Sequence, residues 1–279
     1  LNRGDTMHLV RYKAANGGPQ VGVRVDDGVV PTGHTDMRAF IAGGQAALSE
    51  ARARMTRERP VAPGQILAPI DNPGKMLFLG MTYDVFREGV PIEQEPYVYA
   101  RVQSSIVGPG EAIRLPSEEA HVLYEGELVV VIGEPMFRVA EEDAMRHVLG
   151  YTQANDVTWT QWVHGTSKVG PQICLSKNAD TFCPLGPDIV TADELDPVDL
   201  PFRVTVNGEE RTKASTTGLA WSIPKILEFL CRDMTLWPGD LISTGTCEAK
   251  DLVDGDVVEV EFDGLGVLEN PVVGRWQSA

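Results

Sequence analysis

The sequence predicts an α+β protein in which strands dominate, and three observations support this fold class. Glycine and proline together account for 47 of the 279 residues, 28 Gly and 19 Pro, which favours many turns over long helices. From residue 75 onward, short apolar runs end repeatedly at Gly, Pro, Asn or Asp. One run, Gly126–Ile132, is almost wholly apolar, as a strand buried on both faces would be.

The first 70 residues predict a small N-terminal domain. Residues 7–12 and 21–25 have the alternation of strands, and residues 37–59, rich in Ala and Arg, predict one helix. Prolines 60, 63 and 69 then interrupt the pattern. We therefore place a domain boundary at residue 70 and a larger domain at 71–279, and we treat residues 1–6 as an extension outside the fold.

The sequence of the larger domain predicts short strands with few helices, in a closed or rolled sheet. Residues 139–149 predict a helix, because acidic residues open it and Gly150 follows it. Asn207-Gly208 predicts a type I′ hairpin between strands 202–206 and 209–213. Ser222 is expected to cap a helix that runs to Arg232. Further strands are expected at 75–80, 241–244 and 257–262.

Composition excludes two classes of partner. The formal net charge of -16 repels phosphate backbones, so we expect no nucleic-acid binding. No stretch approaches the roughly 20 apolar residues of a membrane helix, so we expect no membrane partner. The four cysteines form no Cys-x-x-Cys pair, which favours reduced thiols and a cytoplasmic location.

Two glutamates at the start of the apolar strand are the most informative residues. Side chains alternate along a strand, so Glu125 and Glu127 project from one face. Two like charges there repel, and a divalent cation such as Mg²⁺ or Mn²⁺ would remove that cost. Two solvated glutamates at an exposed strand start explain the pattern equally well. Asp156 is a third oxygen ligand if it returns to the same end of the sheet, and otherwise a turn or N-cap residue.

At this point the chain resembles the fumarylacetoacetate hydrolase family. The resemblance covers nearly the whole chain, because the motifs that carry it occur in the family's order. These motifs are residues 7–12 (MHLVRY), 124–133 (YEGELVVVIG), 150–156 (GYTQAND), 177–187 (KNADTFCPLGP), 206–208 (VNG), 234–246 (MTLWPGDLISTGT) and 255–261 (GDVVEVE).

The resemblance implies a mixed β-roll catalytic domain behind a small N-terminal domain, and a homodimer. It implies that Glu125, Glu127 and Asp156 bind Mg²⁺, or alternatively Mn²⁺, and that Lys177 is the active-site lysine. The substrate-binding positions that it implies are Tyr83, Arg101, Thr216 and Thr246.

One stretch departs from the family pattern. Hydrolytic members carry a catalytic dyad in a motif such as Gly-x-Asn-Tyr-x-x-His-x-x-Glu, whereas this chain has Phe86 in place of the histidine and Gly89 in place of the glutamate. The usual general base is therefore missing. His121 is the first replacement candidate, and Glu88 and His164 are weaker ones.

These observations leave three functional hypotheses. The family's default is hydrolysis of a C–C bond in a small α-keto or β-diketo acid, as in its bacterial acylpyruvase members. The missing dyad favours a reaction that needs no activated water, either decarboxylation or keto–enol isomerisation, as in its hydroxyheptadienedioate isomerase-like members. The third hypothesis is a non-catalytic protein that binds a metal and a keto acid.

Overall fold

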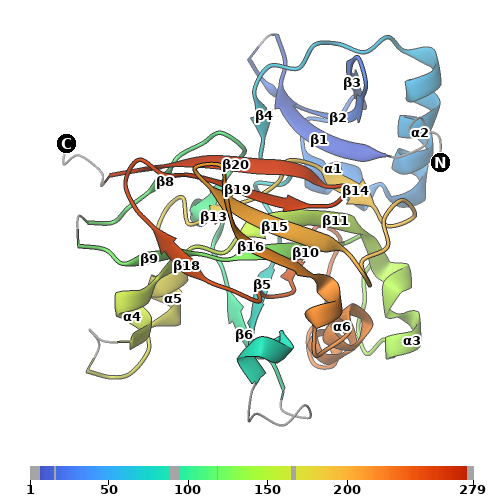
Figure 1. Ribbon diagram of the computed structural model, residues 1–279. Helices are drawn as coiled ribbons and strands as arrows, with labels where there is room; N and C mark the ends of the chain where they lie inside the picture. The colour runs from blue at the N-terminus through green and yellow to red at the C-terminus, as the bar shows by residue number, and fades with distance from the viewer. Residues whose placement is uncertain (1–6, 16, 88–94, 118, 165–167, 275–279) are drawn as a thin grey trace.

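The computed structural model describes residues 7–15, 17–87, 95–117, 119–164 and 168–274. Strands dominate and helices are shorter and fewer, so the predicted α+β, mainly β fold class is confirmed. Figure 1 shows the N-terminal strands and helices at one end of the molecule. In both views α4 (Thr160–His164) and α5 (Ile173–Lys177) lie together, well away from α3 (Glu141–Ala144) and α6 (Ile223–Cys231).

A ten-stranded sheet forms the centre of the molecule, in the order β3-β2-β1-β14-β11-β10-β17-β5-β6, with β4 paired to β1. Strand β10, Gly126–Ile132, lies between β11 and β17, and all seven of its residues are buried, as its apolar sequence predicts. The other strands of this sheet are β1 (His8–Lys13), β2 (Pro19–Val25), β3 (Gly28–Pro31), β4 (Ile66–Leu67), β5 (Met76–Gly80), β6 (Tyr97–Ala100), β11 (Val148–Asn155), β14 (Ile189–Thr191) and β17 (Leu241–Ser243).

A second, five-stranded sheet packs against one face of the first. Its order is β16-β15-β19-β20-β8, and the predicted hairpin between β15 and β16 is present, with Asn207 and Gly208 both at positive φ. Its strands are β8 (Ile113–Arg114), β15 (Pro201–Val206), β16 (Glu209–Ser215), β19 (Val257–Phe262) and β20 (Gly266–Val273). Two small sheets join β12 (Thr158–Trp159), β9 (Val122–Tyr124) and β18 (Lys250–Leu252), and β13 (Cys183–Pro184) with β7 (Ile106–Val107).

Side chains of β10 alternate between two cores. Leu128 and Val130 belong to the core between the two sheets. Val129 and Val131 point the opposite way, into a core shared with the N-terminal helices α1 (Met37–Ala42) and α2 (Gly44–Arg57). The same alternation determines the face of the sheet from which Glu125, just before β10, and Glu127, its second residue, project.

Two predicted helices differ from the structure. Residues 37–59 form two helices rather than one, because Gly43 ends α1 and Gly44 has a φ of +54°. The helix expected at 139–149 is wrong in its second half: α3 ends at Ala144, a 3₁₀ turn (Met145–His147) follows, and Val148 begins β11. The remaining 3₁₀ turns are Asp84–Arg87, Gln103–Ser105 and Thr216–Gly218.

The helix expected after Ser222 is confirmed as α6. The Ser222 side chain accepts a hydrogen bond from the Lys225 backbone N–H, and a proline lies in the first turn. The domain boundary at residue 70 stays a prediction. Strand β1 pairs with β14, and residues from before and after position 70 share one core. Within the described ranges, no helix combines the length and apolar character needed to cross a membrane.

Candidate metal centre

The geometry of one strand explains why two glutamates reach the same place. Glu125 and Glu127 share a face, while Gly126 between them faces the second sheet. A Cβ on Gly126 would lie 2.7 Å from Val204 Cγ2, so this position needs glycine for the two sheets to pack. The two carboxylates therefore point away from the second sheet, toward the side of β10 that Val129 also occupies.

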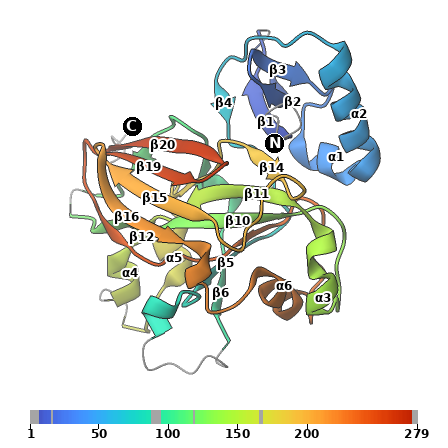
Figure 2. The same cartoon turned by 45° about the vertical axis from the view of Figure 1, so that its right-hand side comes forward.

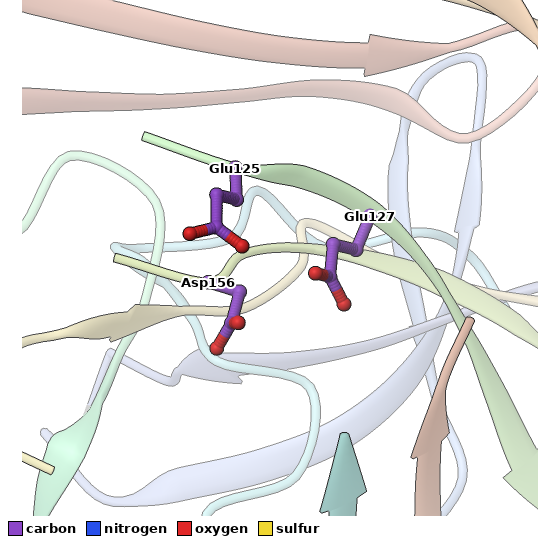
Figure 3. A group of neighbouring side chains, drawn as sticks. All are labelled: Glu125, Glu127 and Asp156. Carbon is purple, nitrogen blue, oxygen red and sulfur yellow. The ribbon is translucent and has the colours of Figure 1, made fainter. Parts of the chain in front are cut away.

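Asp156 reaches the same place through strand pairing. Strands β10 and β11 are antiparallel with Gly126 opposite Asn155, so Asp156 lies beside Glu125, and its N–H donates to the Glu125 carbonyl at 2.8 Å. Oxygens from the carboxylates of Glu125, Glu127 and Asp156 all lie within 4.8 Å of one another. Figure 3 shows the three side chains converging from the two strands.

Two buried cations contact this carboxylate cluster, defined as Glu125, Glu127 and Asp156. Lys177, at the end of α5, places Nζ 3.0 Å from Glu125 Oε2 and in contact with Asp156 Oδ2. Arg101, which follows β6, donates from Nη1 to Asp156 Oδ1 and from Nη2 to the Phe182 carbonyl. The structure thus brings together the predicted metal ligands, the predicted lysine and one predicted substrate-binding residue.

Glu127 differs from its neighbours in its charge environment. It is 1% exposed, and it accepts hydrogen bonds from Ser243 Oγ and, at 3.3 Å, from the Gly245 N–H. The ion pairs of the described residues that reach the cluster go to Glu125 and Asp156, and none goes to Glu127. Burial, reinforced by the nearby Asp156 and Glu125 charges, raises the pKa of Glu127 well above its ordinary value.

The other two carboxyls respond to burial in opposite directions. Burial raises the pKa of Glu125, and Lys177 only partly offsets that rise. Burial alone would also raise the pKa of Asp156, but Lys177 and Arg101 together lower it below its ordinary value. The cluster thus holds one well-compensated carboxylate and two whose ionisation is costly.

The residues fit a hard divalent cation. The ligand set consists of carboxylate oxygens, which Mg²⁺ and Mn²⁺ prefer. Two buried carboxylates and the half-buried Glu125 stand against two buried cations, so one further positive charge is needed before all three ionise at low cost. Glu125, Glu127 and Asp156 would hold such an ion, and the ion would compensate Glu127.

The other three predicted substrate-binding residues, unlike Arg101, make no hydrogen bond or ion pair to the carboxylate cluster among the described residues. Tyr83 is 1% exposed, and its buried hydroxyl has no hydrogen-bond partner among the described residues. Thr246 follows the glycine that contacts Glu127, and its hydroxyl donates to the Glu248 carbonyl at 2.9 Å. Thr216 is not brought to the cluster: its hydroxyl accepts from the Leu200 N–H and donates to the Pro197 carbonyl, both at 2.8 Å.

The two candidate general bases that the structure describes, His121 and His164, do not join the cluster. Both ring nitrogens of His121 are occupied, by Thr160 and by Asp251, at a position where the His121 side chain is 57% exposed. His164 ends α4 and is exposed. Glu88 and Gly89 lie outside the described residues.

Sequence reasoning missed three hydroxyl groups at this site. Tyr99 on β6 donates to Asp156, Thr158 on β12 donates to Glu125, and Ser243 on β17 donates to Glu127. One signal was available, because Tyr99 and Arg101 are two residues apart on an extended segment and therefore share a face. The other two contacts depend on strand pairing that local sequence does not specify.

Comparison with known proteins identifies the family of the chain. The family model described as "Fumarylacetoacetate (FAA) hydrolase C-terminal" matches residues 81–273. The chain is 36% identical over 291 residues to a mitochondrial oxaloacetate tautomerase of Xenopus laevis, covering 96% of this chain and 91% of the relative.

Two solved structures extend the comparison. One is a 5-carboxymethyl-2-hydroxymuconate delta-isomerase from Mycobacterium smegmatis, with 33% identity, a TM-score of 0.76, and coverage of 97% of this chain and 100% of that chain. The other is a maleylpyruvate hydrolase from Sphingobium in complex with manganese(II) and pyruvate, with 29% identity, a TM-score of 0.83 and the same coverage. The chain therefore belongs to the fumarylacetoacetate hydrolase family.

Proposed function

We propose that the protein is a divalent-metal-dependent enzyme that interconverts the keto and enol forms of a small β-keto dicarboxylate of the oxaloacetate class. The observation that carries the proposal is a largely buried carboxylate cluster that contacts an ammonium but no imidazole among the described residues. Hydrolysis needs a base that activates water, and Phe86 and Gly89 supply none. Tautomerisation consumes no water: once the enolate is stabilised, the proton on carbon leaves to solvent, its electron pair passes to the keto oxygen, and solvent returns a proton to that oxygen.

The chain's own residues suit the stabilisation of an enolate. A bound divalent cation supplies a Lewis acid that stabilises negative charge on an enolate oxygen. Burial alone would lower the pKa of Lys177, but the surrounding carboxylates raise it above its ordinary value. The ammonium therefore stays protonated and donates to a substrate oxygen.

The relatives support the same reaction class. The Xenopus relative is named an oxaloacetate tautomerase, and the similarity extends over nearly the full length of both chains. Decarboxylation of the same substrate would release CO₂ and form a different enolate, that of pyruvate, but the negative charge would develop on the same keto oxygen, so the same groups would stabilise it.

Hydrolysis of an acylpyruvate is the second candidate. It is favoured by similarity to the maleylpyruvate hydrolase, whose structure contains manganese(II) and pyruvate. The arrangement of His121 weighs against it, because the ring contacts Thr160 and Asp251 rather than the carboxylate cluster. The expected homodimer, the cytoplasmic location and the identity of the cation, Mg²⁺ or alternatively Mn²⁺, stay predictions alongside it.

Proton NMR separates these reactions in one experiment. Metal-stripped protein is supplied with Mg²⁺ or Mn²⁺ and mixed separately with oxaloacetate in deuterated buffer and with a simple acylpyruvate. Accelerated exchange of the oxaloacetate methylene protons without pyruvate release supports the proposal. Pyruvate from oxaloacetate indicates decarboxylation, and a carboxylic acid plus pyruvate from the acylpyruvate indicates hydrolysis.

Two variants control this experiment. Glu127→Gln removes the uncompensated carboxylate of the cluster, and Glu134→Gln removes an exposed carboxylate just beyond β10. The proposal requires loss of exchange in the first variant only. Metal-dependent stabilisation by keto acids without any turnover would instead support the non-catalytic hypothesis.

A further inference from the structure

Tyr99 shares an acceptor with the lysine of the cluster. Its hydroxyl donates to Asp156 Oδ2, the oxygen that Lys177 Nζ also contacts. Lys177 Nζ lies 5.4 Å from the centroid of the Tyr99 ring, so the phenol and the ammonium approach that oxygen together. Arg101 holds the other oxygen, Oδ1, of the same carboxylate. The Asp156 carboxylate therefore accepts hydrogen bonds from three side chains, those of Tyr99, Lys177 and Arg101.

The donors of Lys177 are fully used in this arrangement. An ammonium has three N–H donors. Lys177 Nζ faces three acceptors: the Asp156 carbonyl at 3.0 Å, Asp156 Oδ2, and Glu125 Oε2 at 3.0 Å. It can donate to a substrate oxygen only if it gives up one of them.

One of these three acceptors would keep a close hydrogen-bond donor from the described ranges after Lys177 turns away, and the other two would not. Glu125 Oε2 has no second donor among the described residues, since Thr158 donates to Oε1. Within the part of the chain that the structure describes, the Asp156 carbonyl would keep only a 3.5 Å contact with Thr158 Oγ1. Asp156 Oδ2 would keep the phenol of Tyr99. It is therefore the acceptor that Lys177 can leave at least cost.

We propose that Tyr99 is a positioning residue that holds Asp156 Oδ2 while Lys177 turns to a substrate oxygen. This inference rests on the proposed function, in which Lys177 donates to the keto or enol oxygen. Without the phenol, the turn would leave a buried carboxylate oxygen short of a donor. Hydrogen bonds to charged groups are strong enough that the loss should lower kcat by about 10- to 100-fold.

The chain offers a matched control for this hydroxyl. Tyr97 lies two residues earlier on β6, is 52% exposed, and has its ring centroid 6.0 Å from that of Tyr99. Tyr97→Phe therefore removes the same group from the same strand without touching Asp156. We would compare Tyr99→Phe, Tyr97→Phe, Lys177→Met and the double variant of Tyr99 and Lys177.

Three measurements separate positioning from a purely structural role. Calorimetry gives the Kd for Mn²⁺ in the protein without substrate. Steady-state kinetics at saturating Mn²⁺ gives kcat and KM for oxaloacetate enol. Calorimetry with oxalate, a planar mimic of an enolate, gives the affinity of the manganese-loaded protein for a ligand that is not turned over.

The expected result is that Tyr99→Phe lowers kcat and oxalate affinity, changes the Mn²⁺ Kd only a few-fold, and has no additional effect when Lys177 is already methionine. A role limited to orienting the metal ligand would instead weaken Mn²⁺ binding by about 10- to 100-fold. That outcome, additive effects in the double variant, or equal effects of Tyr97→Phe and Tyr99→Phe would overturn the inference.

The oxalate cycle also separates failure of this inference from failure of the proposed function. Wild-type protein that binds oxalate but does not turn over oxaloacetate would refute the proposed reaction, and the oxalate affinities would still decide the role of Tyr99. Wild-type protein that binds neither Mn²⁺ nor oxalate would refute both.

Discussion

Neutralising Glu127 should stabilise the metal-free protein, although it replaces a residue at the centre of the site. The Glu127 carboxylate is buried, has two hydrogen-bond donors and has no ion pair within the described ranges. Glutamine keeps the shape and one acceptor oxygen but carries no charge. The substitution therefore removes the desolvation cost of an ionised group and leaves the donors of Ser243 and Gly245 satisfied.

The size of the stabilisation follows from replacing the carboxylate of Glu127 by an amide. Relief of an uncompensated buried charge is worth about 1–3 kcal/mol, and the new amide N–H group, which must find an acceptor, costs about 1 kcal/mol. A net gain of up to about 2 kcal/mol should raise the Tm by up to about 8 °C for a chain of this size. Wild-type protein should instead gain about 2.7 kcal/mol from a metal present at 100 times its Kd, and Glu127→Gln should gain far less.

The pH dependence has a definite sign. The folded-state pKa of Glu127 is raised, so its contribution to stability is complete below the ordinary carboxyl pKa of 4.5 and is lost as the pH rises through the folded value. Metal-free wild-type protein should therefore lose stability relative to Glu127→Gln as the pH rises. Bound metal should remove this difference for the wild type.

Thermal unfolding by circular dichroism, in chelator and in excess Mg²⁺ between pH 5 and 8, measures all of these quantities. Glu134→Gln, which changes an exposed glutamate, should behave as wild type in both conditions. The reasoning would be refuted if Glu127→Gln lowered the Tm in chelator and kept the full metal-induced shift.

Three further predictions concern other parts of the chain. Lys177→Met should lower kcat for tautomerisation by about 100-fold or more while calorimetry still detects Mn²⁺ binding, because the charge on the developing oxyanion loses a preorganised donor. His121→Ala should leave kcat within about threefold of wild type in the same assay, since general-base loss would cost at least about 100-fold. Gly245→Ala should lower the Tm far more than Gly255→Ala: both positions have positive φ, but only at Gly245 would a Cβ meet another atom, Thr82 Oγ1 at 2.0 Å.

The parts of the site that could be predicted from sequence are those set by local alternation. Glu125 and Glu127 are two residues apart on a strand whose apolar sequence identifies it as buried, so their shared face follows from geometry alone. Gly126, between them, faces the second sheet, so the same alternation directs both glutamates away from that sheet. These inferences needed no knowledge of which strands pair.

The parts that could not be predicted depend on contacts between distant segments. Tyr99 reaches Asp156 across 57 positions, and Ser243 reaches Glu127 across 116. The sequence around Val148 resembles the end of a helix, yet it forms a strand because β10 and β14 pair with it. Long-range pairing overrides local propensity there, and that pairing is also what returns Asp156 to the glutamates.

The fate of His121 shows the same limit. Its position four residues before Glu125 places it near the cluster in sequence, but β9 pairs with β12 and β18 and directs the ring to Thr160 and Asp251. Proximity in sequence was therefore a poor guide to proximity in space for this residue.

The central claim is that the carboxylate cluster holds a divalent cation on which keto–enol chemistry depends. The most direct test follows the ultraviolet absorbance of oxaloacetate enol with wild-type protein stripped by a chelator, before and after stoichiometric Mg²⁺ or Mn²⁺ is restored. The account predicts that ketonisation stays at the buffer rate in stripped protein, rises on metal addition, and fails to rise in Glu127→Gln. Equal acceleration by stripped and metal-loaded protein, or by wild type and Glu127→Gln, would contradict it.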